Sequence, residues 1–370
     1  REHGRRYGVV LTTVDHREEM ARLRRAQIEY FAAGGYEKHR QSEEQLAAVM
    51  AALAGGPAGQ FVVNVPNQGQ VDNLPRDAVI ECMAEIDSLG VRPLAVGALP
   101  HAAYAAIAPH VARQELTVEA ALTGTLAGAT LVLHDVDADA LDLLARASER
   151  IVAQVDGSLR ITATTDRTEA LRDADFAILC VSIGGLAAMR NDLEIPERYS
   201  VYQSVGDTVG PGGLARGLRH IPFAVQVARE MERLCPHAWL LNLTNPMTTI
   251  CRAVSRATGI RTIGLCHEVT GVRHHLAGLF NAPAETIALD IAGINHLPVV
   301  LRCTIGGRDG LQMMRDWLAE HGPFALVDEL EINTAFDVFI DRLAVKLTLF
   351  EQLGVLFGAG DRHVAEFFPG

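Results

Sequence analysis

Several features that would identify a class of protein are scarce in this chain of 370 residues. Aromatic residues make up only 5% of it, and 33 basic residues face 45 acidic ones, which gives a net charge of −12. This acidic balance provides no general attraction to phosphate backbones or anionic lipid, so nucleic-acid and membrane-surface roles are disfavoured. The cleanest apolar stretch, at about residues 120–133, is too short to span a bilayer and contains two glycines.

Closely spaced cysteines are also absent. The six cysteines lie far apart, at positions 82, 180, 235, 251, 266 and 303, with no CxxC motif. In a chain of this size that pattern is typical of reduced thiols in a cytoplasmic protein. The charged residues 1–6 have no apolar core behind them and do not resemble a signal peptide.

What the sequence does contain is a regular alternation of strand and helix patterns. Near-continuous apolar runs predict strands at residues 130–135, 158–163, 175–181, 238–243 and 261–266, with helices at 138–154, 168–173, 221–234 and 248–258. Buried strands separated by helices are typical of a parallel sheet covered on both faces. Right-handed connections then make this region a Rossmann-like unit, and the pattern after about residue 290 is α+β.

The first strand of this series ends in an acid that could bind a dinucleotide. Asp135 stands where a Rossmann fold places the carboxylate that accepts ribose hydroxyls, whereas the alternative is that the acids here only cap the next helix, through Asp137. No glycine-rich turn lies about 20 residues upstream, where the dinucleotide fingerprint requires it. Similar glycines occur at 210–215 and 357–363, but their context favours substrate loops over phosphate cradles.

Polar side chains follow other predicted strands. Asn245 stands at a strand end as a natural helix N-cap, and its amide could also bind a sugar hydroxyl. The loop at 206–213 combines glycines with Asp207, as ligand loops at the carboxyl ends of parallel strands do. Cys266 and His296 could be two ligands of a divalent metal, although a core thiol and a hydrogen-bonded imidazole are the commoner explanation.

Together these motifs resemble the family-4 glycoside hydrolases. The resemblance rests on the order and spacing of five motifs and extends over nearly the whole chain. The motifs are IGGL to RNDLEIP at 183–196, GDTVGPGG at 206–213, NLTNP at 242–246, GLCH at 264–267 and GINH at 293–296, with further similarity at 64–70 (NVPNQGQ) and 114–120 (QELTVEA).

The resemblance implies a glycosidase that does not use the usual pair of carboxylates. Members of the family hold NAD and a divalent metal, usually manganese. The cofactor takes hydride from sugar C3, the metal polarises the resulting ketone, a base removes the C2 proton, and the glycosidic oxygen leaves by elimination. Water then adds and the hydride returns, so the net reaction is hydrolysis. The Cys-His pair resembles members that act on non-phosphorylated α-glucosides, α-galactosides or uronides.

The resemblance also implies roles for individual residues. The catalytic and metal assignments are the metal ligands Cys266 and His296, the base Asp361 and the general acid His267. The other assignments are contacts with the sugar by Asn245, Arg190 and Asn67, and contacts with NAD by Asp135, Val181 and Ser182. For Asp361 the alternative is an ordinary turn residue after a glycine.

The chain departs from the family in two respects. The segment that resembles the end of the family's sequence comes first here, so the order is circularly permuted. The first strand, glycine-rich turn and helix of the Rossmann unit have no counterpart near residues 125–126, so we expect a gap in the sheet and no pyrophosphate cradle. The expected domains are a Rossmann-like unit at 126–290, similar to lactate dehydrogenase, and an α+β substrate and oligomerisation domain formed by 1–125 and 291–370.

Two other functions remain open from the sequence. One is an NAD-dependent 2-hydroxyacid dehydrogenase, which would need a catalytic His–Asp pair and no metal. The other is a sugar-binding protein that keeps the fold without the cofactor. Under the leading hypothesis we expect NAD, Mn²⁺ and a small sugar as ligands, no nucleic-acid or membrane partner, and assembly as a homodimer or homotetramer.

Overall fold

The computed structural model describes residues 14–32, 45–72, 79–97, 129–154, 159–327 and 341–368. The predicted domain boundary at 125–126 and the family-like motif at 114–120 lie outside these ranges. None of the described helices is both long and apolar enough to cross a membrane.

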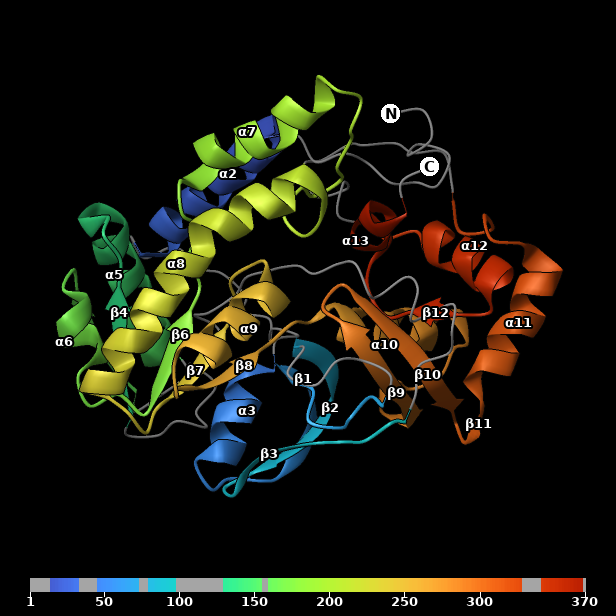
Figure 1. The fold of residues 1–370 in the computed structure, drawn as a ribbon, viewed down its shortest axis with the longest axis horizontal. Coiled ribbons are helices and arrows are strands. Elements are labelled where there is room, and N and C mark those ends of the chain that lie inside the picture. The colour runs from blue at the N-terminus through green and yellow to red at the C-terminus, as the bar shows by residue number, and fades with distance from the viewer. Residues whose placement is uncertain are drawn as a thin grey trace.

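Ten strands form one mixed sheet through the middle of the molecule (Figure 1). Its order is β11-β10-β9-β2-β1-β8-β7-β6, while β12 pairs with β10 and β3 pairs with β2. The strands are β1 (Gly59–Pro66), β2 (Val79–Asp87), β3 (Gly90–Pro93), β6 (Phe176–Leu179), β7 (Trp239–Asn242), β8 (Arg261–Gly264), β9 (Ile287–Ile294), β10 (Leu297–Ile305), β11 (Arg308–Asp309) and β12 (Leu356–Phe357).

The helices between and around these strands follow most of the predicted pattern. They are α2 (Val14–Ala32), α3 (Leu46–Leu53), α5 (Ala138–Gln154), α6 (Arg167–Leu171), α7 (Gly185–Glu197), α8 (Gly210–Leu234), α9 (Met247–Ala257), α10 (Glu268–Leu279), α11 (Gly310–His321), α12 (Ala344–Leu353) and α13 (Asp361–Val364). The helix predicted at 221–234 begins earlier, at Gly210, because the glycines that suggested a loop pack inside the first turn of α8.

The parallel strands β6, β7 and β8 are covered on both faces, as the apolar runs predict. Side chains on a strand alternate between faces, and neighbours on β7 show this directly. Leu240 packs in a core with Met231 of α8 and Ile250 of α9, whereas Leu241 packs in a core that includes Leu46 of α3. All five of these side chains are fully buried.

The sheet continues beyond its parallel strands with antiparallel ones. Beyond β8 the pairing is antiparallel, from β8 to β1, from β1 to β2, from β2 to β9 and from β9 to β10. The strands of the predicted α+β part therefore continue the Rossmann-like sheet instead of forming a separate one. The expected boundary at residue 290 falls within β9.

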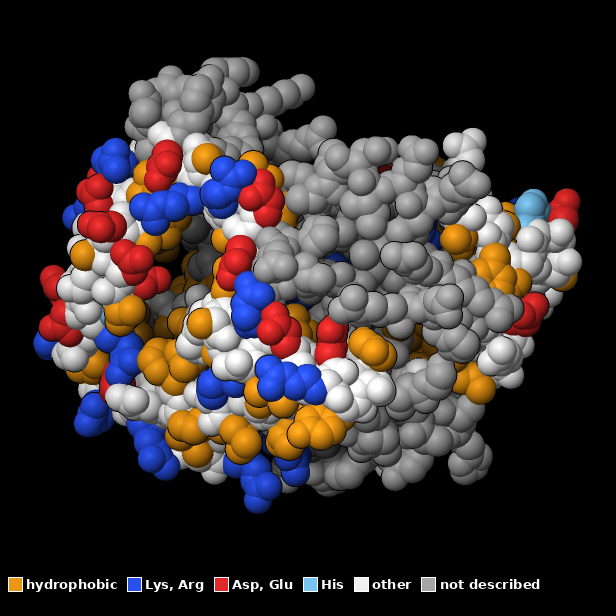
Figure 2. Space-filling view, turned by 90° about the horizontal axis from the view of Figure 1, so that it is seen from above, with side chains coloured by type: hydrophobic (Ala, Val, Ile, Leu, Met, Phe, Trp, Pro, Cys, Tyr) orange, Lys and Arg blue, Asp and Glu red, His pale blue; other side chains and the backbone are white. Residues whose placement is uncertain are grey.

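Within the described residues, β4 (Thr130–His134) and β5 (Arg160–Thr164) form a parallel pair apart from the large sheet, and β6 stands at one end of that sheet. The expected gap falls between β4 and β6. A cavity of about 2110 Å³ is lined by β4, by β6 and by helices around them. Val132 on β4 is 37% exposed, in contrast to Leu240 and Leu241 of β7, which are fully buried. Figure 2 shows the surface hollowed at this end of the molecule, with hydrophobic side chains bordering the hollow.

The difference in burial predicts a difference in stability. Val63→Ala on β1 removes methyl groups from a fully buried site and should lower the free energy of unfolding by about 2 kcal/mol. The same change at Val132 should cost less than about 0.5 kcal/mol, because that side chain is already partly in solvent. Urea unfolding of both variants measures this, and equal losses would contradict the open arrangement of β4.

Candidate active site and metal centre

Loops from several strands meet beside the carboxyl ends of β6, β7 and β8. Parallel strands bring these ends to one edge of a sheet, which is where α/β folds bind ligands. The loop after β7 contains Asn245 and the loop after β8 contains Cys266 and His267. Pairing of β2 with β9 brings the turn with His296 to the same region.

His296 lies in a two-residue turn between β9 and β10, where Ile294 pairs with Leu297. Its φ of 66° is in the left-handed region, which is uncommon for a residue other than glycine. The side chain is 1% exposed, and its Nδ1 atom is buried without a hydrogen-bond partner. Backbone strain of this kind clusters at ligand sites, so it points to a functional role for His296.

His363 lies on the short helix α13, and its ring packs against that of His296 in a tilted arrangement. The two ring centroids are 3.7 Å apart, with the ring planes inclined by 41°. The Nδ1 atom of His363 is also buried without a hydrogen-bond partner, and its Nε2 atom lies 3.8 Å from Oε1 of Glu268. The amide of Gly360 donates to the other oxygen of Glu268 at 2.7 Å, which fixes this carboxylate beside the imidazole.

Asp207 completes the group from the loop before α8. Its side chain is fully buried, and the hydroxyl of Thr208 donates to Oδ1 at 2.8 Å. Two backbone amides of this loop donate to Glu366 at 2.6 and 2.7 Å, so the loop has a fixed position. Gly213 allows α8 to approach closely, because a Cβ there would lie 2.2 Å from the carbonyl carbon of Thr208.

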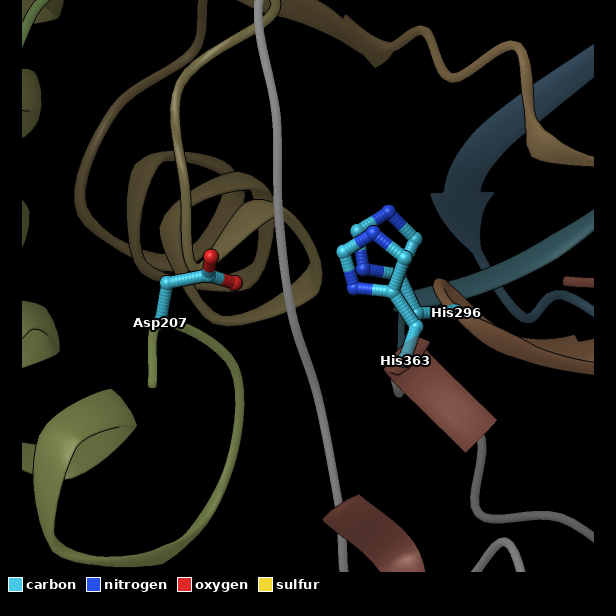
Figure 3. Close-up of side chains that lie close together, drawn as sticks. All are labelled: Asp207, His296 and His363. Carbon is cyan, nitrogen blue, oxygen red and sulfur yellow. The ribbon is translucent and has the colours of Figure 1, made fainter. Parts of the chain in front are cut away.

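The three side chains face one another, and their chemistry suits a metal ion (Figure 3). One potential ligand atom of each lies within 4.8 Å of the others. Burial, aided by the nearby charge of His363, lowers the pKa of His296 well below its usual value, and burial lowers the pKa of His363 to about 3. Both imidazoles are therefore neutral at pH 7 and keep a lone pair for a ligand. Two imidazoles and one carboxylate are suitable ligands for a divalent transition metal.

The predicted ligand Cys266 lies in a different environment. Its side chain is 3% exposed and packs with Met247 and Cys251. Burial and then the charge of Glu81 raise the pKa of the thiol well above its usual value. A thiol binds a metal as thiolate, so a bound ion would have to offset this shift. Among the described residues, the structure does not bring Cys266 into the group of Asp207, His296 and His363.

A buried carboxyl group on β2 was not assigned from the sequence. Glu81 is fully buried, and Asn64 and Asn295 donate to its Oε1 at 3.0 and 3.1 Å. Its Oε2 atom is buried without a hydrogen-bond partner, and burial raises the pKa of the group to about 7. Glu81 thus connects the predicted ligand Cys266 electrostatically with the turn that holds His296.

The predicted base Asp361 lies on α13 and is held by hydrogen bonds from the first turn of α12. Its two oxygens accept hydrogen bonds from the amides of Val345 and Lys346 at 2.9 and 3.0 Å. Burial and then the charge of Asp341 raise its pKa to about 7. Lys346 is 2% exposed, with its Nζ atom 2.7 Å from Asp341. Burial lowers the pKa of Lys346, but the charges of Asp341 and Asp361 outweigh it and the net shift is upward.

The three residues predicted to contact the sugar differ in their hydrogen-bond and ion-pair partners. Asn245 is 1% exposed, accepts a hydrogen bond from the amide of Met247, and has a buried Nδ2 atom without a partner, so it can donate to a ligand. Asn67 is bonded to three backbone groups of its own loop. Arg190 forms ion pairs with two glutamates, on α2 and α7.

The predicted NAD contacts lie on the two sides of the gap. Asp135 is exposed, lines the cavity after β4, and accepts a hydrogen bond from the amide of Asp137. Asp137 accepts from two amides of α5, so it caps that helix as the alternative interpretation expected. Val181 and Ser182 line the cavity after β6, where the amide of Val181 donates to the hydroxyl of Thr244 at 2.8 Å.

The predicted general acid, His267, lies at the wall of the cavity. The side chain of His267 is 38% exposed, and its Nε2 atom lies 3.7 Å from Oε1 of Glu268.

Sequence reasoning did not assign Glu268, His363 or Asp207 individually. Their three segments are far apart in the chain, so no local spacing could have grouped them; the glycine-rich context of Asp207 was the one available signal.

Comparison with protein families agrees with the resemblance and with the permuted order. The family model described as "Family 4 glycosyl hydrolase" matches residues 110–282. The model described as "Family 4 glycosyl hydrolase C-terminal domain" matches residues 5–134. The match to the C-terminal domain therefore begins ahead of the other match. This is the order predicted from the motifs.

Curated proteins similar to this chain are glycosidases. An α-galacturonidase of Thermoanaerobacterium saccharolyticum is 34% identical over 267 residues, which are 69% of this chain and 56% of that protein. An α-galacturonidase of Bacillus subtilis is 36% identical over 266 residues, covering 69% and 57%. An α-galactosidase of Bacillus subtilis is 39% identical over 189 residues, covering 51% and 44%. The chain thus spans about half the length of the curated relatives it matches.

Solved structures confirm the Rossmann-like α/β fold. A Bacillus subtilis protein named as a glucosidase superposes with a TM-score of 0.57 at 34% identity, covering 65% of this chain and 56% of its own. A 6-phospho-α-glucosidase from gut microorganisms, solved with NAD and Mn²⁺, superposes with a TM-score of 0.53 at 23% identity, covering 63% and 52%.

The buried charges beside the site predict a large effect of one substitution. Lys346→Met leaves Asp341 and Asp361 buried without their cation, which should lower the free energy of unfolding by about 3–5 kcal/mol. Adding Asp341→Asn should restore part of the loss. Arg146→Met, which removes an exposed ion pair, is the control and should change stability little. Urea unfolding measures all three, and a Lys346→Met variant as stable as the control would disprove the charge coupling.

Proposed function

This chain belongs to family 4 of the glycosyl hydrolases, and on that premise we propose that it hydrolyses α-glycosidic bonds of non-phosphorylated sugars with NAD and a divalent metal ion. The observation that carries the proposal is the group of Asp207, His296 and His363 beside the carboxyl ends of the parallel strands, in which the first two side chains are buried and the third is half-buried. The α-galacturonidases and the α-galactosidase among the relatives support the substrate class.

The residues present fit a metal ion. The Nδ1 atoms of His296 and His363 are buried without partners, and a bound ion would satisfy such atoms. We propose Asp207, His296 and His363 as ligands, and the family resemblance keeps Cys266 as a competing ligand. Glu268 lies beside Nε2 of His363, where carboxylates orient metal-binding imidazoles. When bound, the ion supplies Lewis-acid polarisation of sugar oxygens.

The residues present fit NAD only in part. Asp135 after β4 and Ser182 after β6 line the two sides of the cavity and can contact the nucleotide. Among the described residues, no strand with a glycine-rich turn and helix stands between them, so a pyrophosphate cradle is missing from that place. When bound, NAD supplies reversible hydride transfer with the sugar.

Proton transfer is the part of the reaction that the chain's own residues perform. Asp361 lines the cavity, and its pKa of about 7 suits a base that takes a proton at neutral pH. The amides at the start of α12 hold it in place, while the ammonium group of Lys346 bonds to Asp341 and acts on Asp361 through its charge. His267 stands at the cavity wall, where it can donate a proton to the leaving oxygen. Asn245 can donate a hydrogen bond to the sugar through its Nδ2 atom.

Location and assembly belong to the same proposal. All six cysteines lie in the described residues and none is in a disulfide, which supports a reducing compartment such as the cytoplasm. A homodimer or homotetramer stays a prediction.

The missing cradle favours one second candidate, a sugar-binding protein that does not use NAD. The metal group and Asn245 lie on the β6 side of the gap, so sugar binding does not require the cradle. This candidate predicts sugar affinity without turnover, and the experiment below separates it from hydrolysis.

The proposed chemistry predicts a specific set of rates. Aryl α-glycosides should be hydrolysed only when NAD and Mn²⁺ are both present, and substrate deuterated at C2 should react more slowly. Asp361→Asn should lower kcat by about 10²–10⁴-fold, since it removes the base. Glu320→Gln, an exposed change on α11, is the matched control and should keep full activity.

Two results of that assay would contradict hydrolysis by this route. Turnover without any isotope effect at C2, or turnover without NAD, would exclude the proposed elimination. Binding of the glycoside in calorimetry, with no turnover under any condition, would instead support the sugar-binding candidate.

The proposed set of metal ligands predicts how strongly two variants of the protein bind cobalt. Co²⁺ titrated into the metal-free protein should bind through His296 and His363, so His363→Ala should weaken binding by more than about tenfold. Cys266→Ser should leave both the affinity and the near-ultraviolet spectrum unchanged. A thiolate-to-cobalt absorption band that disappears in Cys266→Ser would show that Cys266 is a ligand, and unchanged binding by His363→Ala would remove that residue from the site.

A further inference from the structure

We propose that Glu81 is a positioning residue of the active site, because it closes a buried ring of hydrogen bonds between the turn that contains His296 and the first turn of α9. This role rests on the proposed function, in which His296 is a metal ligand and Asn245, just before α9, contacts the sugar. The ring would hold these two groups in a fixed relation to each other.

Four residues from four parts of the chain form this ring. Asn64 of β1 and Asn295 of the β9–β10 turn each donate from Nδ2 to Oε1 of Glu81, at 3.0 and 3.1 Å. The hydroxyl of Thr248 on α9 donates to Oδ1 of Asn64 and accepts from the backbone amide of Asn295, each at 3.4 Å. Every member therefore has two bonded neighbours within the ring.

The ring is buried on a face of the sheet that is otherwise apolar. All four members are at most 4% exposed. Asn64 and Glu81 lie opposite each other on β1 and β2, and on the same face the next opposed pair, Val62 and Met83, packs in an apolar cluster. Burying polar groups costs free energy, and apolar side chains at these places would stabilise the sheet at least as well. We infer that the ring is kept for what it positions.

The first group that the ring positions is His296. Its left-handed backbone, with φ of 66°, is costly for a residue other than glycine and needs support from its surroundings. The preceding residue, Asn295, donates from its backbone to Thr248 and from its side chain to Glu81. Two bonds at the residue before the strained position fix the turn, and the turn in turn sets the direction of the imidazole.

The second group is the start of α9, which is bonded to Asn245. Thr248 is the second residue of this helix, and the amide of Met247, its first residue, donates to Oδ1 of Asn245 at 3.1 Å. A displacement of the first turn of α9 would therefore move Asn245 as well. Through Thr248 and Asn295, the ring joins the proposed sugar contact to the turn that holds the proposed metal ligand.

The ring requires of Glu81 a hydrogen-bond acceptor, not a charge. Both amides donate to the same oxygen, Oε1, and the side-chain oxygen of glutamine can accept the same two bonds. Glu81→Gln should therefore preserve the ring, whereas Glu81→Leu removes the acceptor. Thr248 offers a second, independent pair of variants, because Thr248→Ser keeps the hydroxyl and Thr248→Val removes it with little change of shape.

The first measurement is Co²⁺ binding by the full chain. Glu81→Leu and Thr248→Val should each weaken binding by at least about tenfold, while Glu81→Gln and Thr248→Ser should stay within about threefold of the unmodified chain. Val63→Ala is the control for lost stability, since Val63 is fully buried on β1 and faces away from Asn64, and it should bind Co²⁺ normally. Equal losses in Glu81→Gln and Glu81→Leu, or a loss as large in Val63→Ala, would overturn the proposal.

Hydrogen exchange of the metal-free chain separates the ring from the proposed function. The Asn295 amide should be protected in the unmodified chain and in Glu81→Gln, and should exchange at least about tenfold faster in Thr248→Val. The amide of Leu243, which donates to Leu179, should be unchanged throughout. Equal exchange of the Asn295 amide in all variants would overturn the proposal. The expected exchange pattern in a chain that does not bind Co²⁺ would support the ring and refute the proposed metal ligands.

Discussion

The pairing of β1 with β8 on one edge and with β2 on the other is the interaction on which the site depends. Gly264 of β8 lies opposite Asn64 of β1, Asn64 opposite Glu81 of β2, and Glu81 opposite Gly293 of β9. This row crosses four strands that are far apart in the sequence and sets the loop after β8 beside the turn after β9. Gly264 is required in the row, because a Cβ there would lie 2.7 Å from the Cβ of Asn64.

Unfavourable features gather at one place on this frame. Glu81, His296 and His363 each bury a polar side-chain atom without a hydrogen-bond partner, and each such atom costs about 1–3 kcal/mol. The left-handed backbone of His296 adds to this cost. The groups around them are well bonded, as the two amides that donate to Glu81 show. Polar atoms that are buried without partners, in surroundings whose hydrogen bonds are otherwise made, indicate that the arrangement is kept for a ligand. Binding of that ligand would recover part of the free-energy cost.

Sequence reasoning succeeded where the signal was local. The predicted and observed bounds of α5 agree at 138–154, because a strong apolar periodicity and an acidic N-cap lie within the segment itself. α8 was predicted too short because its first glycines look like a loop, and only the contact between Gly213 and Thr208 shows why a helix needs them. Asp207 and His363 were missed as a pair because packing across the sheet, not spacing along the chain, brings them together.

The gap between β4 and β6 in the described part of the chain affects the two halves of the site unequally. The metal group is built from the loop before α8, the β9–β10 turn and α13, all of which are anchored to the large sheet or packed against it. The nucleotide half depends on β4, which contacts the rest of the protein without a continuous ladder. A sheet transmits position through its hydrogen bonds, so β6 to β10 can hold their loops whether or not the gap is filled. Asp135 and Ser182, by contrast, follow β4 and β6, two strands that no described ladder joins. The proposed metal ligands and the proposed nucleotide contacts are therefore held by separate parts of the fold.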